Sequence, residues 1–334
     1  MRYVEAGGVR LSAIGLGTWQ FGSFDWGYGR AYADTTARDI TRRALDLGIN
    51  LFDTAELYGF GRSERILAEA LGQRRDEAFI ATKITPVMPL APIVEQRARA
   101  SLRRLKTDHL DLYQVHAPNP VVPDGPTMAG MRRLIDSGLV HNVGVSNYGL
   151  DRWKRADAAL GEPVLSNQVS FSLVERGPER DLVPFARDND RFVIAYSPLA
   201  QGLLGARYDA ENRPSGAARR MNPLFLPENL ERASGLIEAL RDIALEKGVR
   251  PAQIALAWVI RRPNVVAIPG ASSVEQLESN AAAAEIELTN EEDLRLTTEA
   301  ERFQPVGRAA MARGLAESLA GSVRERIQGL RPGR

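Results

Sequence analysis

Short apolar runs recur along the chain, and each ends in a polar or glycine-rich turn. The eight runs span 11–19, 50–54, 79–83, 112–116, 142–147, 165–169, 192–197 and 265–270. Stretches with apolar residues near helical spacing lie between them, as at 36–48, 63–73 and 91–105. Strands that read as continuous apolar runs and alternate with helices are typical of a parallel sheet covered by helices. The pattern predicts one closed (β/α)8 barrel, a TIM barrel, over residues 1–304.

An open doubly wound sheet would show a similar alternation of strands and helices. That fold normally carries G-x-G-x-x-G after its first strand, whereas the first run here continues as GLGTWQ (15–20) and lacks the third glycine. Before the barrel, residues 2–5 and 9–11 flank Gly7-Gly8, which predicts an N-terminal β-hairpin.

Three segments extend beyond the simple barrel pattern. Residues 19–35 and 198–228 are too long for plain turns, and they predict long loops after the first and seventh strands. Residues 305–334 carry six Arg against two acids, with an apolar stripe at helical spacing: Leu315, Leu319, Val323, Ile327 and Leu330. They predict a C-terminal helical tail that packs on the barrel, with a subunit contact as the alternative.

Composition and charge narrow the function. The 334 residues are 44% hydrophobic and include 43 Lys plus Arg against 42 Asp plus Glu, so no overall field would attract nucleic acid or an anionic membrane. The absence of cysteine excludes disulfides, thiolate catalysis and Cys-ligated metal centres, so redox chemistry would need a bound cofactor. No signal peptide or membrane-length apolar run is evident, which predicts a cytoplasmic protein. The oligomeric state stays open.

Four chemically reactive side chains stand at the ends of consecutive predicted strands. Asp53 with Tyr58 just beyond, Lys83 and His116 follow one another at 30 and 33 residues, about one strand–helix unit each. In a parallel barrel the carboxyl ends of all strands open on one face, where active sites are assembled. Each residue alone has a structural explanation: a turn cap, a loop aromatic, a snorkelling amine or a rim histidine. Together they predict one shared site.

Carbonyl reduction fits this set of side chains. Hydride transfer to a carbonyl carbon leaves negative charge on oxygen, and Tyr58 could supply the proton. An unperturbed phenol titrates near ~10, so we expect the Lys83 ammonium to lower the pKa of Tyr58 while Asp53 holds Lys83 charged. His116 would donate a second hydrogen bond to the oxyanion, or relay a proton in alcohol oxidation.

At these residues the sequence resembles the aldo-keto reductase superfamily. The matching motifs are GINLFDTAELYG (48–59), ATK (81–83), DLYQVH (111–116), GVSNY (144–148) and IPGASSVEQLESN (268–280), in the family's order over roughly residues 2–300. The branch looks like that of bacterial reductases akin to potassium-channel β subunits. The resemblance implies an (α/β)8 barrel that uses a nicotinamide cofactor, with Asp53, Tyr58, Lys83 and His116 as the catalytic tetrad and Tyr58 as the acid.

The resemblance also implies a cofactor site. Ser146, Asn147 and Gln168 should bind the nicotinamide carboxamide, and Tyr196 should stack on the ring. The pyrophosphate loop would be Ser197, Leu199, Gln201 and Gly202, and the adenine end would be Gly270, Ser272, Ser273, Gln276 and Asn280. Ser273 and Gln276 also fit a helix capping box, which is a purely structural role.

The family's pattern bears on which cofactor is bound. Many members that prefer NADPH have Lys in place of Gly270 and Arg in place of Gln276, although the channel-β-like branch keeps the Gln and still resembles NADPH binders. An arginine of the 198–228 loop could supply the charge: Arg207, Arg213, Arg219 or Arg220. We expect NADPH to be preferred and NADH to be possible.

Aromatic residues lie in the loops expected over the catalytic face. Trp19, Phe24, Trp26 and Phe60 would line a substrate pocket suited to aldehydes and moderately hydrophobic ketones.

The alternatives to a carbonyl reductase are an NAD(P)-dependent dehydrogenase of sugars or secondary alcohols, which would use the same residues, and a slow nucleotide-binding regulatory subunit. His109 and His141 precede their strands and share no metal-binding motif with His116, so no metal site is expected.

Overall fold

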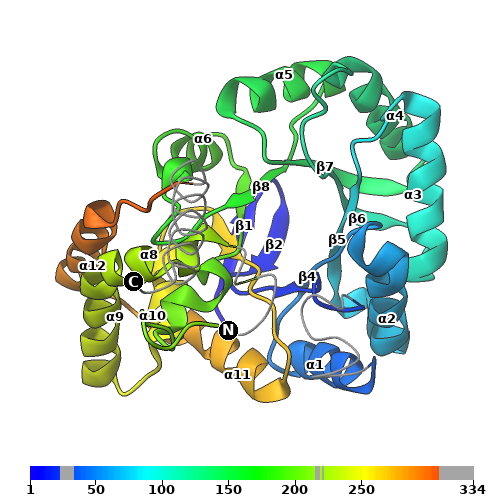
Figure 1. Ribbon diagram of the computed structural model, residues 1–334. Helices are drawn as coiled ribbons and strands as arrows, with labels where there is room; N and C mark the ends of the chain where they lie inside the picture. Colours follow the sequence, from blue (N-terminus) through cyan, green and yellow to red (C-terminus); the bar gives the residue numbers. More distant parts are fainter. Residues whose placement is uncertain (23–33, 215–218, 220–221, 308–334) are drawn as a thin grey trace, which may run out of the picture.

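A single curled sheet of parallel strands forms the centre of the molecule. The computed structural model describes residues 1–22, 34–214, 219 and 222–307. Eight strands hydrogen-bond in chain order. They are β3 (Leu16–Gly17), β4 (Leu51–Asp53), β5 (Phe79–Ile84), β6 (Leu110–Val115), β7 (Val140–Ser146), β8 (Ser166–Ser170), β9 (Phe192–Tyr196) and β10 (Val265–Ala267). Helices surround the sheet (Figure 1), which confirms the predicted (β/α)8 barrel.

The barrel closes between its first and last strands. Parallel bridges join Ile14 to Ala267 and Gly17 to Gly270. Glycine is needed at position 17, because a Cβ there would lie 2.7 Å from the carbonyl oxygen of Ile268. The predicted first strand, 11–19, is divided in the structure: its start belongs to the hairpin and only Leu16–Gly17 pairs with β4.

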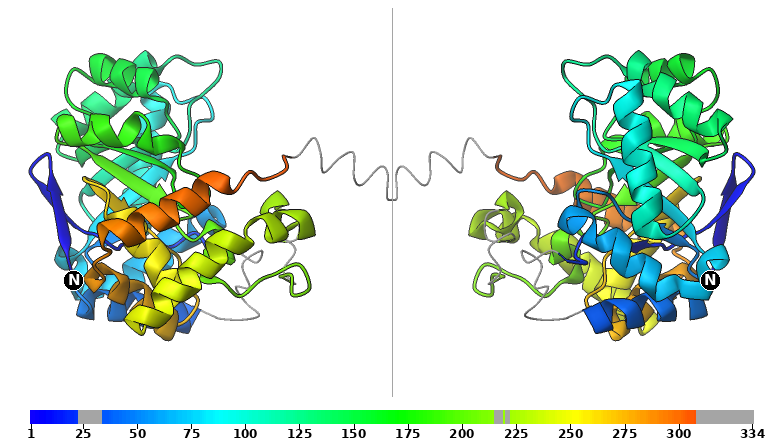
Figure 2. Two further views of the ribbon diagram at one scale, coloured as in Figure 1. Left: turned by 90° about the vertical axis from the view of Figure 1, so that its left-hand side faces the viewer. Right: turned by 90° about the vertical axis from the view of Figure 1, so that its right-hand side faces the viewer.

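The predicted N-terminal hairpin is present and closes one end of the barrel. Strands β1 (Tyr3–Ala6) and β2 (Val9–Ser12) are antiparallel, and Gly7 and Gly8 take φ of 55° and 74°, as a tight two-residue turn requires. Ala6 and Leu11 pack into the same apolar cluster as residues of the barrel interior such as Leu112. Figure 1 shows the hairpin across the centre of the ring, and Figure 2 shows it projecting from one side.

The helices follow from amphipathic patterns or from complete burial. Those on the barrel are α1 (Asp34–Asp46), α2 (Arg62–Leu71), α3 (Ala91–Leu105), α4 (Asp124–Asp136), α5 (Leu150–Leu160), α6 (Leu182–Asp188), α8 (Pro227–Arg232), α9 (Ser234–Lys247), α10 (Pro251–Ile260), α11 (Val274–Ala282) and α12 (Asn290–Arg302). Short 3-10 turns are η2 (Tyr58–Gly61), η3 (Gly72–Glu77), η4 (Gly177–Glu179), η5 (Ala200–Gly205), η6 (Pro223–Phe225) and η7 (Ala283–Glu285). Helix α10 is apolar on every side and is buried, as such helices generally are.

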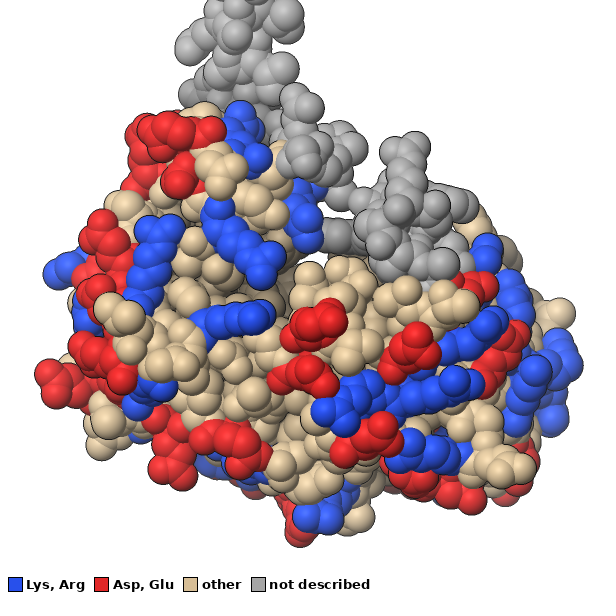
Figure 3. Space-filling view, turned by 90° about the horizontal axis from the view of Figure 1, so that it is seen from below, with Lys and Arg blue, Asp and Glu red and all other residues tan. Residues whose placement is uncertain are grey.

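The two long connections and the tail are only partly described. The 198–228 segment contains η5, η6 and the start of α8, whereas most of 19–35 and all of 308–334 lie outside the described residues. The predicted helical tail and the domain boundary at 304 therefore stay predictions. Within the described residues, no helix is long and apolar enough to cross a membrane. Figure 3 shows acidic and basic side chains mixed over one face.

Candidate functional site

Asp53, Tyr58, Lys83 and His116 come together at the end of the barrel opposite the hairpin. Lys83, fully buried on β5, donates hydrogen bonds from Nζ to the Asp53 carboxylate at 2.7 Å, to the Thr54 carbonyl at 2.9 Å and to the Tyr58 hydroxyl at 3.1 Å. The His116 ring meets the Tyr58 ring edge to face, with 5.7 Å between centroids. All three ammonium protons are used, so Lys83 is fixed in position.

The segment that carries Tyr58 is anchored by Glu56, a partly buried acid to which the sequence alone assigned no role. Glu56 accepts from the backbone N–H of Thr85 at 2.6 Å and from Arg97 Nε at 2.9 Å. Arg97 also donates to the Thr85 carbonyl at 2.9 Å. These contacts tie the segment between β4 and η2 to the end of β5 and to α3, and so fix the position of the Tyr58 phenol.

The net shift of the Tyr58 pKa is opposite to the predicted one. Burial raises the pKa of the phenol and outweighs the lowering by the Lys83 ammonium. The sequence showed the cation beside the phenol but not how deeply the packing would bury it. For Lys83, burial acts to lower the pKa, yet Asp53 and Tyr58 raise it above its ordinary value. The structure therefore holds a protonated phenol beside a charged ammonium.

His116 is held as a neutral imidazole. Burial, together with the nearby Lys83 charge, lowers the pKa of His116 to about 3. Its Nδ1 atom is buried and has no hydrogen-bond partner among the described residues. A neutral ring can still donate through Nε2, so the geometry favours a hydrogen-bond donor over an acid at neutral pH.

This pKa predicts how the stability of the fold depends on pH. In the unfolded chain His116 titrates near ~6.5, so between that pH and about 3 the unfolded state binds more protons, and acid favours unfolding. We expect His116→Gln to remove this component. The unfolding free energy of the variant minus that of the wild type should therefore be about 3 kcal/mol larger at pH 4 than at pH 8. Urea unfolding at several pH values measures it. Parallel curves for both proteins would contradict the assignment.

A cavity of about 1140 Å³ opens above these residues. On one wall, Ser146 Oγ donates to the Gln168 carbonyl at 2.8 Å, and the Tyr196 hydroxyl donates to Asn147 Oδ1 at 2.9 Å. Gln168, predicted to bind the nicotinamide carboxamide, donates from Nε2 to Asp53 Oδ1 at 2.7 Å. Gln168 thus links this wall to Asp53, the partner of Lys83, although the two residues lie 115 positions apart in the sequence.

The cavity rim contains left-handed backbone at residues other than glycine. Phe60, Asn147, Ser197 and Gln201 have φ between 50° and 61° and all line the cavity. Such conformations are costly and cluster where the surrounding structure enforces a functional geometry. Leu199 and Gly202 line the same rim as Ser197 and Gln201, as the predicted pyrophosphate loop requires.

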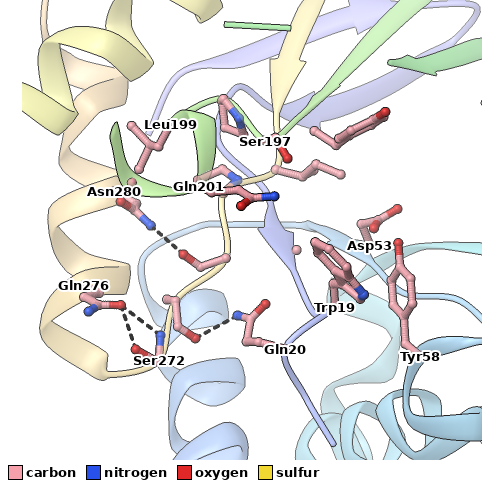
Figure 4. A pocket seen from close by; sticks show the side chains of 18 of the residues that line it. Trp19, Gln20, Asp53, Tyr58, Ser197, Leu199, Gln201, Ser272, Gln276 and Asn280 are labelled. Atoms are coloured by element: carbon pink, nitrogen blue, oxygen red, sulfur yellow. Dashed lines mark hydrogen bonds between the residues drawn. The ribbon is translucent and has the colours of Figure 1, made fainter. Parts of the chain in front are cut away.

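The far end of the cavity lies beside α11 (Figure 4). The Ser272 N–H and hydroxyl both donate to Gln276 Oε1 at 3.0 Å, and Asn280 Nδ2 donates to the Gly270 carbonyl at 3.3 Å. Ser273 lies outside the cavity lining and caps the helix by accepting from Gln276 N–H. Ser273 therefore caps α11, as the capping-box pattern predicts. The Gln276 side chain does not complete that box, because it bonds to Ser272 and not to Ser273.

Aromatic side chains also border the mouth. Trp19 is 48% exposed, and its ring lies 6.5 Å from that of Tyr58, while Phe60 is 88% exposed. Both line the cavity, together with Leu57. The other predicted pocket residues, Phe24 and Trp26, lie outside the described residues.

Some cavity residues could not be found from strand ends. Gln20 and Arg250 line the cavity, and Arg250 comes from the start of α10, in the helical layer. Ser, Thr, Asp and Asn are preferred at the position before a helix, and Arg is unusual there. This departure was the sequence feature that could have pointed to a functional role for Arg250. Among the loop arginines considered, Arg207 and Arg219 line the cavity, Arg213 does not, and Arg220 is outside the described residues.

Known proteins resemble this chain in sequence and in architecture. Residues 13–299 match the Aldo/keto reductase family. An oxidoreductase of Mycobacterium tuberculosis is 58% identical over 307 residues, with 92% of this chain and 95% of the relative covered. The methylglyoxal reductase YeaE of Escherichia coli is 34% identical, with 86% and 90% covered. A Klebsiella pneumoniae aldo-keto reductase solved in complex with NADPH has a TM-score of 0.71 at 30% identity, with 92% and 97% covered.

Proposed function

Since the chain belongs to the aldo/keto reductase family, an oxidoreductase family acting on carbonyl and alcohol groups, we propose that it reduces aldehydes and ketones with NADPH and that Tyr58 is the acid. The hydrogen bond from the Lys83 ammonium to the Tyr58 hydroxyl, at the floor of the cavity, carries this proposal. Because the phenol oxygen accepts from Lys83, its own proton is free to point into the cavity.

The proton transfer follows from this geometry. Burial keeps the proton on Tyr58 until negative charge develops on a carbonyl oxygen above it. The phenolate that then forms lies 3.1 Å from a charged ammonium, which stabilises it. Neutral His116 would donate a second hydrogen bond to the same oxygen. Asp53 keeps Lys83 charged and aimed.

The cavity residues fit a nicotinamide dinucleotide. Such a cofactor supplies the hydride when bound. Tyr196 lines the cavity with its hydroxyl bonded to Asn147, and its ring would stack on the nicotinamide, while Ser146, Asn147 and Gln168 form a polar wall for a carboxamide. The cavity continues past the strained Ser197–Gln201 segment to α11, and this reach suits a ligand with two nucleotide halves. The reductase from Klebsiella pneumoniae was solved with NADPH, which supports the choice.

For the adenine end, the cavity lining offers a cation from the helical layer, Arg250 at the start of α10. A Cβ at Gly270 would lie 2.6 Å from Gln20 Oε1, so a lysine at position 270 would have to displace the Gln20 side chain, which donates to the Ala271 carbonyl at 2.8 Å. The exposed Arg250 guanidinium donates no hydrogen bond to any described residue and forms no ion pair with one. We propose that Arg250 faces the 2′-phosphate that distinguishes NADPH from NADH.

Changing Arg250 tests the cofactor preference. We expect Arg250→Ala to raise the Kd for NADPH by about tenfold, because a charge-assisted contact to a phosphate contributes about 1.5 kcal/mol. The Kd for NADH should stay the same, which makes NADH the internal control. Arg250→Lys should lie in between. Fluorescence titration measures both constants, and equal losses for the two cofactors would assign Arg250 to the shared part of the dinucleotide.

The function is tested by following NADPH absorbance with a panel of aldehydes, ketones and sugars, repeated with NADH and in the oxidative direction. The proposal expects the fastest turnover with NADPH and with apolar or aromatic aldehydes, since Trp19, Leu57 and Phe60 border the mouth. Faster alcohol oxidation at neutral pH would favour the dehydrogenase alternative. Tight NADPH binding without turnover would favour a regulatory role.

A further inference from the structure

Two histidines and an aspartate gather at the end of the barrel that the hairpin closes, away from the cavity. Within the described part of the chain, ligand atoms of His109, Asp111 and His141 all lie within 4.8 Å of one another. His109 and Asp111 stand at the start of β6, and His141 stands at the start of β7. No motif spacing predicts this group, because its members come from two strands.

Strand register puts the three side chains on one face. Leu110 pairs with Val140 and Leu112 with Asn142, which places Asp111 beside His141. His109 lies two residues before Asp111, so it shares that face, while the buried Leu110 and Leu112 point the other way. The His109 and His141 rings stack with 4.2 Å between centroids.

The hydrogen bonds of His109 and Asp111 leave one acceptor atom on each side chain, and these two atoms face each other. His109 Nδ1 donates to Asp108 Oδ1 at 2.7 Å, so the neutral ring carries its lone pair on Nε2. A carboxylate that orients a histidine in this way is the usual arrangement behind a metal-bound imidazole. Asp111 Oδ2 is occupied by Arg75 and by the Ile80 N–H, at 2.6 and 2.9 Å. Asp111 Oδ1 stays available, 3.5 Å from His109 Nε2.

The 3.5 Å between His109 Nε2 and Asp111 Oδ1 suits two ligands of a tetrahedrally coordinated cation. Zinc bonds of about 2.1 Å to nitrogen and oxygen set neighbouring ligands about 3.4 Å apart. We propose that His109, Asp111 and His141 bind a divalent transition-metal ion of the zinc class, with solvent as the fourth ligand. His141 is exposed, so its ring can turn from the stack to aim a nitrogen at the ion. Imidazole and carboxylate donors select such metals over Mg²⁺ or Ca²⁺.

The site would join β6 to β7 and act on stability, because the catalytic side chains lie at the other ends of these strands. Arg75, Arg103 and Lys106 also border His109, so repulsion between cations predicts modest affinity. This inference is independent of the proposed reductase activity.

Titration of the full chain with ZnCl₂ at pH 7.5 tests the site. Calorimetry should give one Zn²⁺ per chain for the wild type and for His116→Gln, the matched control at the third histidine. We expect at least tenfold weaker binding in His141→Gln and Asp111→Asn, and a zinc-dependent rise in Tm that both variants lose.

His141 is exposed, so His141→Gln should fold even if changes at Asp111 disturb the Arg75 ion pair. Undiminished affinity in both variants would overturn the proposal. Binding that disappears in His116→Gln and persists in His141→Gln would assign the ion to the cavity, and would overturn it equally.

Discussion

Tyr58→Phe should lower kcat for aldehyde reduction by about 10²- to 10⁴-fold, because it removes the proton that the nascent alkoxide needs. The ring keeps its contacts with Trp19 and His116, and Lys83 keeps its bonds to Asp53 and Thr54. The Kd for NADPH and the unfolding free energy should therefore change little. Stopped-flow absorbance with saturating NADPH, together with fluorescence titration, measures both effects.

Tyr113→Phe provides the matched control. Tyr113 is fully buried on β6, and its hydroxyl has no hydrogen-bond partner among the described residues. Removing an unsatisfied buried hydroxyl should leave activity unchanged and stability equal or slightly higher. Wild-type turnover in Tyr58→Phe with good aldehyde substrates would contradict the acid role. A loss of NADPH binding in the same variant would instead show a structural role.

Residues that act from strand ends were predictable from the sequence. Asp53, Lys83 and His116 recur at about one strand–helix unit, and a parallel barrel brings the carboxyl ends of all its strands to one face. The convergence follows from topology alone. The hairpin was equally accessible, because a tight two-residue turn needs positive φ at both central residues, and Gly7-Gly8 adopts it without steric cost.

Features that depend on packing were not predictable. The net direction of the Tyr58 pKa is set by burial, which no local pattern encodes. Gln168 bonds to Asp53 and Gln20 packs against Gly270 across long sequence separations. Arg250 reaches the cavity from a helix start, whereas the barrel rule points only to strand ends. The first predicted strand was too long for a similar reason: pairing partners, and not apolarity, decide where β2 ends and β3 begins.

Lys83→Met should be the most damaging single change to both stability and activity. Lys83 and Asp53 are almost completely buried, so removing the ammonium leaves an unpaired carboxylate in the barrel interior. Breaking a buried pair in this way costs about 3–5 kcal/mol. Activity should also collapse, because the Tyr58 phenolate would form without a neighbouring positive charge. Urea unfolding and initial rates, measured where the variant is folded, test the two effects, and Lys154→Met is the exposed control.

The double variant Asp53→Asn with Lys83→Met separates stability from catalysis. Without either charge the desolvation penalty disappears, and the amide oxygen introduced by Asp53→Asn could still accept from Gln168, so most of the lost unfolding free energy should return while activity stays absent. The stability deficit of Lys83→Met alone should shrink as the pH falls toward 4, since an unpaired buried Asp53 has a raised pKa and is neutralised by protonation. A double variant as unstable as Lys83→Met would show that the ammonium stabilises the barrel by packing and not by pairing. Full activity in Lys83→Met would remove Lys83 from the proposed mechanism.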